Sequence, residues 1–124
     1  MIIRYIKREH GHLTALGILD DTARPLHAEK PSRIAGYVPD VFAFDAPMTV
    51  VIVGEAKTAN DLESEHSLNQ IRAYMSYLGQ QHSGIFILAV PWQATRRAHT
   101  IVESLRSRTG AQSISAIILD DLGW

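Results

Sequence analysis

The chain of 124 residues contains no cysteine. This absence excludes disulfide frameworks, thiol nucleophiles and zinc sites built on thiolates. It is also consistent with a reducing compartment. The first residues, MIIRYIKREHGHL, mix charged with apolar side chains and offer no small-residue cleavage site, so they do not resemble a signal peptide. We therefore expect a cytoplasmic protein.

Long apolar runs and an excess of one charge are also missing. No run approaches the roughly 20 residues that a membrane-spanning helix needs, so we expect no membrane partner. The formal net charge is −1, whereas proteins that coat nucleic acid nonspecifically usually carry a large basic excess. Any contact with nucleic acid would therefore depend on a local basic patch or on metal ions.

The sequence does have enough apolar residues for a folded core. They make up 46% of the chain, which is typical of globular proteins and excludes a disordered chain. The length favours a single domain over residues 1–124. A domain of this size buries roughly two thirds of its unfolded surface, which is enough for a core without covalent staples.

Apolar spacing, glycine and proline predict alternating helices and strands. We expect, in order, a helix, two strands, a helix, a strand, a helix and a strand, over residues 2–19, 33–44, 49–57, 60–81, 84–90, 91–110 and 113–119. Pro39 predicts that the first strand is an edge strand or is bulged. The run TVVIV predicts a strand buried on both faces. The fold class is therefore α/β, with a central mixed sheet flanked by helices.

The 60–81 helix is expected to begin at Asn60 or Asp61 as N-cap and to end at Gly79 or Gly84. The next helix should start after Pro91, with Trp92 facing inward. The inward-facing stripe of the 60–81 helix is expected to be Leu68, Ile71, Met75 and Leu78.

Three charged residues converge in this arrangement. Glu55 and Lys57 are two positions apart on a strand, so they point to the same face. A hairpin turning at about residues 45–48 brings Asp40 alongside Glu55. Two carboxylates suit Mg²⁺, which takes oxygen ligands together with waters and substrate phosphates. The alternative is a solvated Glu–Lys pair of little energetic weight, but the apolar run before Glu55 favours a position near the core.

Pro39-Asp40, followed by Glu55-Ala56-Lys57, resembles the PD-(D/E)xK motif of the restriction-endonuclease-like nucleases. The predicted element order is similar to that superfamily's core, a helix, a three-stranded meander, a helix and a strand, over roughly residues 2–90. The resemblance implies that Asp40 and Glu55 bind Mg²⁺, which Mn²⁺ can replace. It also implies that the Ala56 carbonyl assists them and that Lys57 serves the nucleophilic water.

Gln70 and Tyr74 lie one turn apart on the following helix, about 100° from its apolar stripe. This Gln-x-x-x-Tyr pattern is similar to one in several nuclease branches of the superfamily, including RecB-type domains. The resemblance implies that Gln70 supports the active site and that Tyr74 supports it or contacts DNA. The alternative is a polar residue beside a half-buried tyrosine.

An acid on the first helix usually completes the metal site in this superfamily. Glu9 is the candidate, and Glu29 replaces it if the helix is shorter; each is otherwise a surface acid. Arg96 and Arg97 are candidate phosphate contacts, unless they belong to a solvated helix face.

These observations predict a Mg²⁺-dependent nuclease that hydrolyses DNA phosphodiester bonds. A domain this small is expected to need a homodimer or a partner protein for specificity, by analogy with small junction resolvases of this fold. Two alternatives remain open. The chain is a catalytically inactive interaction or regulatory module with the same fold, or it is another α/β enzyme or small-ligand binder that matches the motif by chance.

Overall fold

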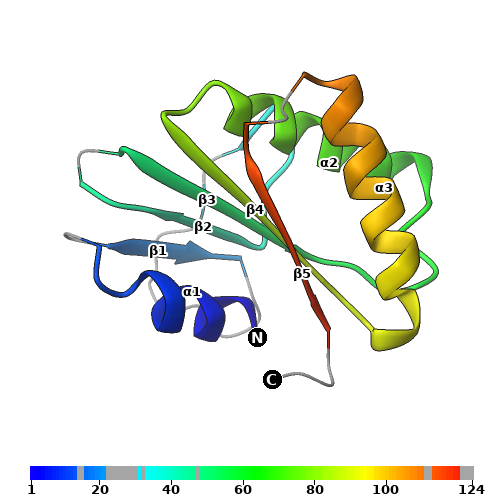
Figure 1. Cartoon of the computed structure of the whole chain (residues 1–124), viewed down its shortest axis with the longest axis horizontal. Helices are drawn as coiled ribbons and strands as arrows, with labels where there is room; N and C mark the ends of the chain where they lie inside the picture. Colours follow the sequence, from blue (N-terminus) through cyan, green and yellow to red (C-terminus); the bar gives the residue numbers. More distant parts are fainter. Residues whose placement is uncertain (14–15, 22–30, 32, 47, 111–112, 121–124) are drawn as a thin grey trace.

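A five-stranded mixed sheet forms the centre of the fold (Figure 1). The computed structural model describes residues 1–13, 16–21, 31, 33–46, 48–110 and 113–120. The elements are α1 (Ile2–His10), β1 (Gly17–Asp20), β2 (Val41–Phe44), β3 (Val50–Ala56), α2 (Glu65–Gly79), β4 (Ser83–Val90), a short 3₁₀ helix η1 (Trp92–Ala94), α3 (Thr95–Arg108) and β5 (Ser115–Asp120). The predicted α/β class, a mixed sheet with flanking helices, is confirmed.

The strands follow one another across the sheet in chain order. The β1–β2 and β2–β3 pairs are antiparallel, whereas the β3–β4 and β4–β5 pairs are parallel. Parallel neighbours need a crossover, and α2 and α3 supply the two crossovers. As a result, the carboxyl ends of β3, β4 and β5 lie at the same end of the sheet as the amino end of β2.

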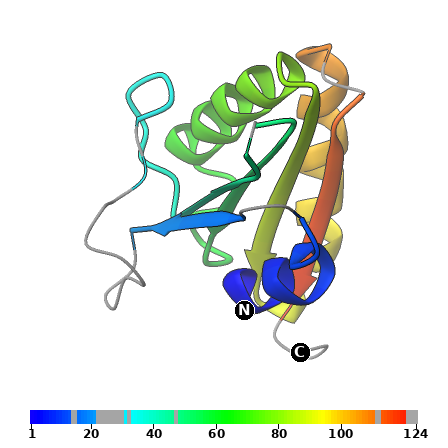
Figure 2. The ribbon, with the colours of Figure 1, turned by 90° about the vertical axis from the view of Figure 1, so that its left-hand side faces the viewer.

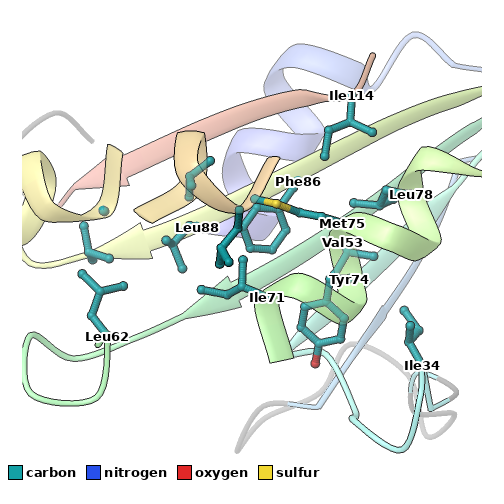
Figure 3. Close-up of a cluster of buried hydrophobic side chains, with 14 of the residues drawn as sticks. Ile34, Val53, Leu62, Ile71, Tyr74, Met75, Leu78, Phe86, Leu88 and Ile114 are labelled. Atoms are coloured by element: carbon teal, nitrogen blue, oxygen red, sulfur yellow. The ribbon is translucent and has the colours of Figure 1, made fainter. Parts of the chain in front are cut away.

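The helices cover the two faces of the sheet unequally. Both views show α2 and α3 together and α1 apart from them (Figures 1 and 2). The α2 and α3 face has the larger core, which includes Val53, Tyr74, Met75 and Phe86 (Figure 3). The α1 face has a smaller core, which includes Ile6, Ile52 and Ile87. Since β3 contributes to both clusters, the prediction that it is buried on both faces is confirmed.

The turn between β2 and β3 lies where the sequence predicts it. The Asp45 carboxylate accepts hydrogen bonds from Thr49 Oγ1 at 2.6 Å and from the Val50 amide at 2.8 Å. The Met48 amide donates to the Asp45 carbonyl at 2.6 Å, and Met48 has a positive φ of 69°. These bonds close the hairpin and fix the register that sets Val41 opposite Gly54.

The prediction of a helix over residues 2–19 is wrong beyond His10. Residues 17–20 instead form β1, antiparallel to β2. Gly17 pairs with Phe44, and a Cβ at Gly17 would come within 2.9 Å of the Phe44 ring. Gly17 has no Cβ, so it leaves room for the Phe44 ring and allows this strand to pair. Tertiary pairing has overridden the helical spacing of the leucines.

The strand predicted over residues 33–44 is also too long. Residues 34–37 make an isolated bridge around Ala35 and Gly36, whose φ values are 52° and 88°. Pro39 lies before β2, which is an interior strand between β1 and β3. The edge or bulge predicted from Pro39 is therefore wrong, because the proline occupies no ladder position.

Two helix starts differ from the predictions. The N-cap of α2 is Ser64, whose hydroxyl accepts a hydrogen bond from the Ser67 amide at 3.1 Å, and not Asn60 or Asp61. The helix ends at Gly79, as predicted. Trp92 lies in η1 and is 51% exposed, so the prediction that it faces the core is wrong. Within the described part of the chain, no helix combines the length and apolarity needed to cross a bilayer.

Candidate active site

The hairpin register places Asp40 beside Glu55. Val41 pairs with Gly54 in the antiparallel ladder, so the residue before Val41 lies opposite the residue after Gly54. The Asp40 amide donates to Glu55 Oε2 at 3.1 Å, and the Ala56 amide donates to Asp40 Oδ2 at 2.8 Å. Each carboxylate is thus held by the backbone of the opposite strand. Two carboxylates meet at one end of the sheet, as the spacing predicts.

Lys57 joins these acids on the same face. Its Nζ lies 3.8 Å from Glu55 Oε1 and 2.5 Å from Gln70 Oε1. The Lys57 amide donates to the Ala89 carbonyl of β4 at 2.9 Å, which fixes the backbone at the end of β3. The side chains of Lys57 and Glu55 are only 11% and 6% exposed. This burial contradicts the alternative of a solvated surface ion pair.

Gln70 connects the lysine to the glutamate through its amide. Its Oε1 accepts from Lys57, and its Nε2 donates to Glu55 Oε1 at 3.2 Å and to the Tyr74 hydroxyl at 3.0 Å. The amide therefore fixes the orientation of both charged groups. One turn of α2 separates Gln70 from Tyr74, so both side chains reach the end of β3.

Tyr74 is fully buried, with 0% relative exposure. Its ring packs on Phe86 within the larger core, and Figure 3 shows its hydroxyl pointing away from that ring. Since no part of Tyr74 reaches the surface, it supports Gln70 in this structure and does not offer a contact to DNA. The buried face of α2 is also wider than the predicted stripe, because it includes Gln70 and Tyr74.

The electrostatics of the two acids follow from this burial. The pKa of Glu55 is raised from 4.5 to about 7: desolvation and then the adjacent Asp40 carboxylate raise it, while the hydrogen bonds from Asp40 and Gln70 and the charge of Lys57 lower it. Desolvation also raises the pKa of Asp40, while the Ala56 amide and Lys57 lower it. Desolvation also raises the pKa of Tyr74, and the negative charge of Glu55 is the next largest cause of that rise. Two neighbouring acids that resist ionisation favour the binding of a cation.

Glu9 does not join this cluster. It lies in the last turn of α1 and forms an ion pair with Arg8 at 3.0 Å. Along the helix it is about 10 Å from Ile2, which packs against Gly54 beside the site. Among the described residues, no group of three His, Asp or Glu side chains is placed to hold a metal ion. The competing candidate, Glu29, lies outside the described residues.

The two arginines predicted to bind phosphate lie at the start of α3. Arg96 and Arg97 are both exposed, and Arg97 Nη1 is 3.9 Å from Glu63 Oε1. Because α3 follows the carboxyl end of β4, both arginines lie at the end of the sheet that carries the acids. In the described part of the chain, the structure shows no contact between either arginine and Asp40, Glu55, Lys57 or Gln70.

Asp21 was not recognised as a neighbour of the acids. It directly follows β1, and its amide donates to the Asp40 carbonyl at 2.8 Å. Its negative charge contributes to the raised pKa of Asp40. Residues 20 and 21 lie outside the predicted elements, so only a correct prediction of β1 would have located Asp21 here.

The arrangement defines an α/β domain with a buried carboxylate–amide–lysine cluster at one end of its sheet. Comparison with protein-family models, curated proteins and solved structures gave no significant match to this chain. The function must therefore be inferred from the cluster and from the fold that carries it.

Proposed function

We propose that this protein is a Mg²⁺-dependent nuclease of the PD-(D/E)xK type that hydrolyses phosphodiester bonds of DNA. The observation that carries the proposal is the convergence of two carboxylates with Lys57 on the same face of the sheet: Glu55 accepts from the Asp40 amide, and Asp40 accepts from the Ala56 amide. The order α1, β1, β2, β3, α2, β4, with an antiparallel β1–β2–β3 meander, supports a restriction-endonuclease-like core.

The donor set fits Mg²⁺. This ion is usually held by one or two carboxylates, with waters and substrate phosphates completing its shell. Asp40 and Glu55 supply two such carboxylates, and the exposed Ala56 lies between Glu55 and Lys57 at the end of β3, where its carbonyl is the further candidate ligand. When bound, the ion would offset negative charge at the scissile phosphate and promote ionisation of the attacking water.

The chain's own residues divide the remaining tasks. Lys57 is the cation available to orient the attacking water and to stabilise charge that develops on the phosphate. Gln70 holds the Lys57 ammonium through Oε1 and the Glu55 carboxylate through Nε2, so the two keep a fixed distance. Tyr74 fixes the Gln70 amide from inside the core. Burial of Glu55 and Lys57 limits competing hydration and strengthens their interaction with charge.

The test combines cleavage with metal binding. Labelled single-stranded, duplex, nicked, flap and four-way-junction DNA would be incubated with Mg²⁺, Mn²⁺ or EDTA. Asp40→Asn, Glu55→Gln and Lys57→Ala would be compared with Glu103→Gln, an exposed acid on α3. We expect metal-dependent cleavage that all three site variants abolish, and a Mn²⁺-dependent thermal shift that Asp40→Asn and Glu55→Gln remove.

Two results would contradict the proposal. Cleavage that survives all three site substitutions would come from another site or a contaminant. The absence of both cleavage and a Mn²⁺ shift would favour an inactive interaction module of the same fold. Measurement of the molecular mass in solution, alone and with DNA, tests the further proposal that the nuclease acts as a homodimer.

A further inference from the structure

An apolar pocket of about 260 Å³ lies beside Asp40, on the face of the sheet covered by α1. The start of α1 forms one wall through Met1, Ile2 and Ile3. Ala56 of β3 and Ala89 of β4 contribute small side chains to the lining. Among the described lining side chains, that of Asp40 is the one that carries a charge. The pocket is therefore an apolar chamber with one wall in the proposed active site.

The pocket and the catalytic cluster share the end of β3. Glu55 and Lys57 point toward α2, so Ala56 between them points to the opposite face, toward α1. Asp40 borders both, because its carboxylate accepts from the Ala56 amide. A ligand that crosses this end of the sheet would meet the carboxylates on one face and the pocket on the other.

The size of the pocket limits what it can hold. Pockets for whole drug-sized ligands measure about 300–1,000 Å³, so 260 Å³ suits a single flat ring system. Its surroundings add a second restriction. The exposed surface of α1 presents Arg4, Lys7 and Arg8 against one acid, Glu9, although the whole chain is slightly negative. The helix that walls the pocket therefore carries exposed cations, and an apolar pocket beside such a helix suits a nucleotide, which combines an apolar ring with a phosphate.

Two exposed apolar side chains lie near this end of the sheet, one at the pocket and one just after the end of β4. Met1 is 45% exposed and lines the pocket. Trp92 is 51% exposed and follows Ala89 by three residues. Single-strand binding sites commonly combine a basic track with exposed apolar and aromatic surface. Here Met1 supplies exposed apolar surface at the pocket, and α1, whose first residues wall the pocket, carries the exposed cations.

We propose that this pocket receives an unpaired nucleobase next to the phosphate held at Asp40 and Glu55. The substrate is then a nucleic acid with single-stranded character at the cleavage position, such as a single strand, a flap or a frayed end. A base in intact duplex cannot enter without leaving its stack and its partner. This inference rests on the proposed nuclease function and names its substrate class.

The first experiment changes the volume of the pocket. Ala89→Leu adds three carbons inside it, and Ile3→Ala removes three from its opposite wall, so the double variant conserves volume. Ala116→Leu on β5 is the matched control, because Ala116 packs on the other face of the sheet. Ala89→Val is a milder filling variant. Binding and cleavage of a short labelled single strand and of the same sequence as duplex would be measured, with the Mn²⁺ thermal shift alongside.

We expect Ala89→Leu to weaken single-strand binding and cleavage about tenfold or more, the effect typical of losing one base contact. The Mn²⁺ shift should persist, the double variant should recover most of the loss, and Ala116→Leu should match the wild type. The wild type should prefer the single strand over the duplex. Equal activity on both substrates, unchanged in Ala89→Leu, would overturn the pocket proposal and leave the nuclease proposal intact.

A second experiment needs no protein variant. One abasic nucleotide is moved along the single strand, position by position, past the cleaved bond. We expect cleavage by the wild type to fall about tenfold at one position beside that bond. Uniform cleavage at every position would overturn the base pocket. If the wild-type protein neither cleaves nor shows an Asp40-dependent Mn²⁺ shift, the nuclease proposal itself fails, and the pocket assignment fails with it.

Discussion

The amide of Asp40 donates a 3.1 Å hydrogen bond to the carboxylate of Glu55, although fifteen positions separate the two residues. The contact exists because the β2–β3 hairpin sets Val41 opposite Gly54. This hydrogen bond holds the two acids side by side, where burial disfavours the ionised form of each carboxyl group.

The metal-free protein should lose stability as the pH rises. The pKa of Glu55 is about 7 in the folded state and 4.5 ordinarily. Between these two pH values the folded carboxyl keeps its proton, whereas the unfolded carboxyl has lost it. Stability is therefore highest below that window and falls as the pH rises through it, by up to about 3 kcal/mol. Asp40, Lys57 and Tyr74 face this carboxyl, and the raised pKa of Asp40 acts in the same direction.

Denaturant unfolding in EDTA at about pH 5 and about pH 8 tests this prediction. Glu55→Gln should gain stability relative to the wild type as the pH rises, while the exposed Glu103→Gln should show no such change. Added Mg²⁺ should stabilise the wild type more at the higher pH, because the proposed site would hold the ion through the ionised acids. Equal slopes for Glu55→Gln and the wild type would contradict the assignment of the proton to Glu55.

Removal of the Gln70 amide should affect both activity and stability. Gln70→Ala leaves the buried Tyr74 hydroxyl and Glu55 Oε1 without the donor they share, which costs about 1–3 kcal/mol. Lys57 also loses the acceptor that holds it, so kcat should fall by more than KM changes. The control is Gln93→Ala, an exposed glutamine in η1. Wild-type kcat in Gln70→Ala would show that Lys57 needs no positioning.

Tyr74 should act through Gln70 and not through the substrate. Tyr74→Phe keeps the ring in the core and deletes only the hydroxyl that accepts from Gln70. We expect a lower kcat with KM for DNA unchanged, and a loss of about 1 kcal/mol in the free energy of unfolding. Tyr77→Phe, three residues later on α2 and packed on Phe42, is the matched control. A raised KM in Tyr74→Phe alone would indicate a direct contact with substrate.

Gly54 should be intolerant of a side chain, because α1 packs directly on it. A Cβ at this position would come within 2.7 Å of Ile2 Cγ2. Gly54→Ala should therefore destabilise the fold by about 1–3 kcal/mol. The same substitution should cost less in an Ile2→Ala background, which a double-mutant cycle of unfolding free energies measures. Additive effects would mean that α1 moves freely away from the sheet.

The parts of the fold read correctly from sequence are those with strong local signals. The apolar run of β3 and the turn at Asp45 fixed the hairpin, and the alternation of side chains placed Glu55 and Lys57 on one face. The convergence of Asp40 with these residues followed from hairpin length alone. The amide network of Gln70 was partly anticipated, because one helical turn joins Gln70 to Tyr74.

The errors arise where tertiary contacts decide. The leucine spacing before residue 20 fits a helix, but Gly17 accommodates Phe44 and completes a strand that lies beside β2. Because the sequence did not predict β1, it also did not predict that Asp21 lies beside Asp40. The sequence does not show that Tyr74 is fully buried. An amphipathic pattern indicates the main apolar stripe of α2, but it does not show that the end of β3 covers the side of the helix next to that stripe. The hydrophobicity of Trp92 predicts a position in the core, but Trp92 lies in η1, a tight turn that precedes α3.

All side chains of the carboxylate–amide–lysine cluster come from residues 40 to 74, which cover the β2–β3 hairpin and α2 as far as Tyr74. The loop after α1 and the segment between α3 and β5 contribute none of its side chains among the described residues. New binding elements could therefore be inserted at either point without altering the bonds that hold Glu55. Such insertions would change what the domain contacts and leave the arrangement of the cluster at the end of β3 unchanged.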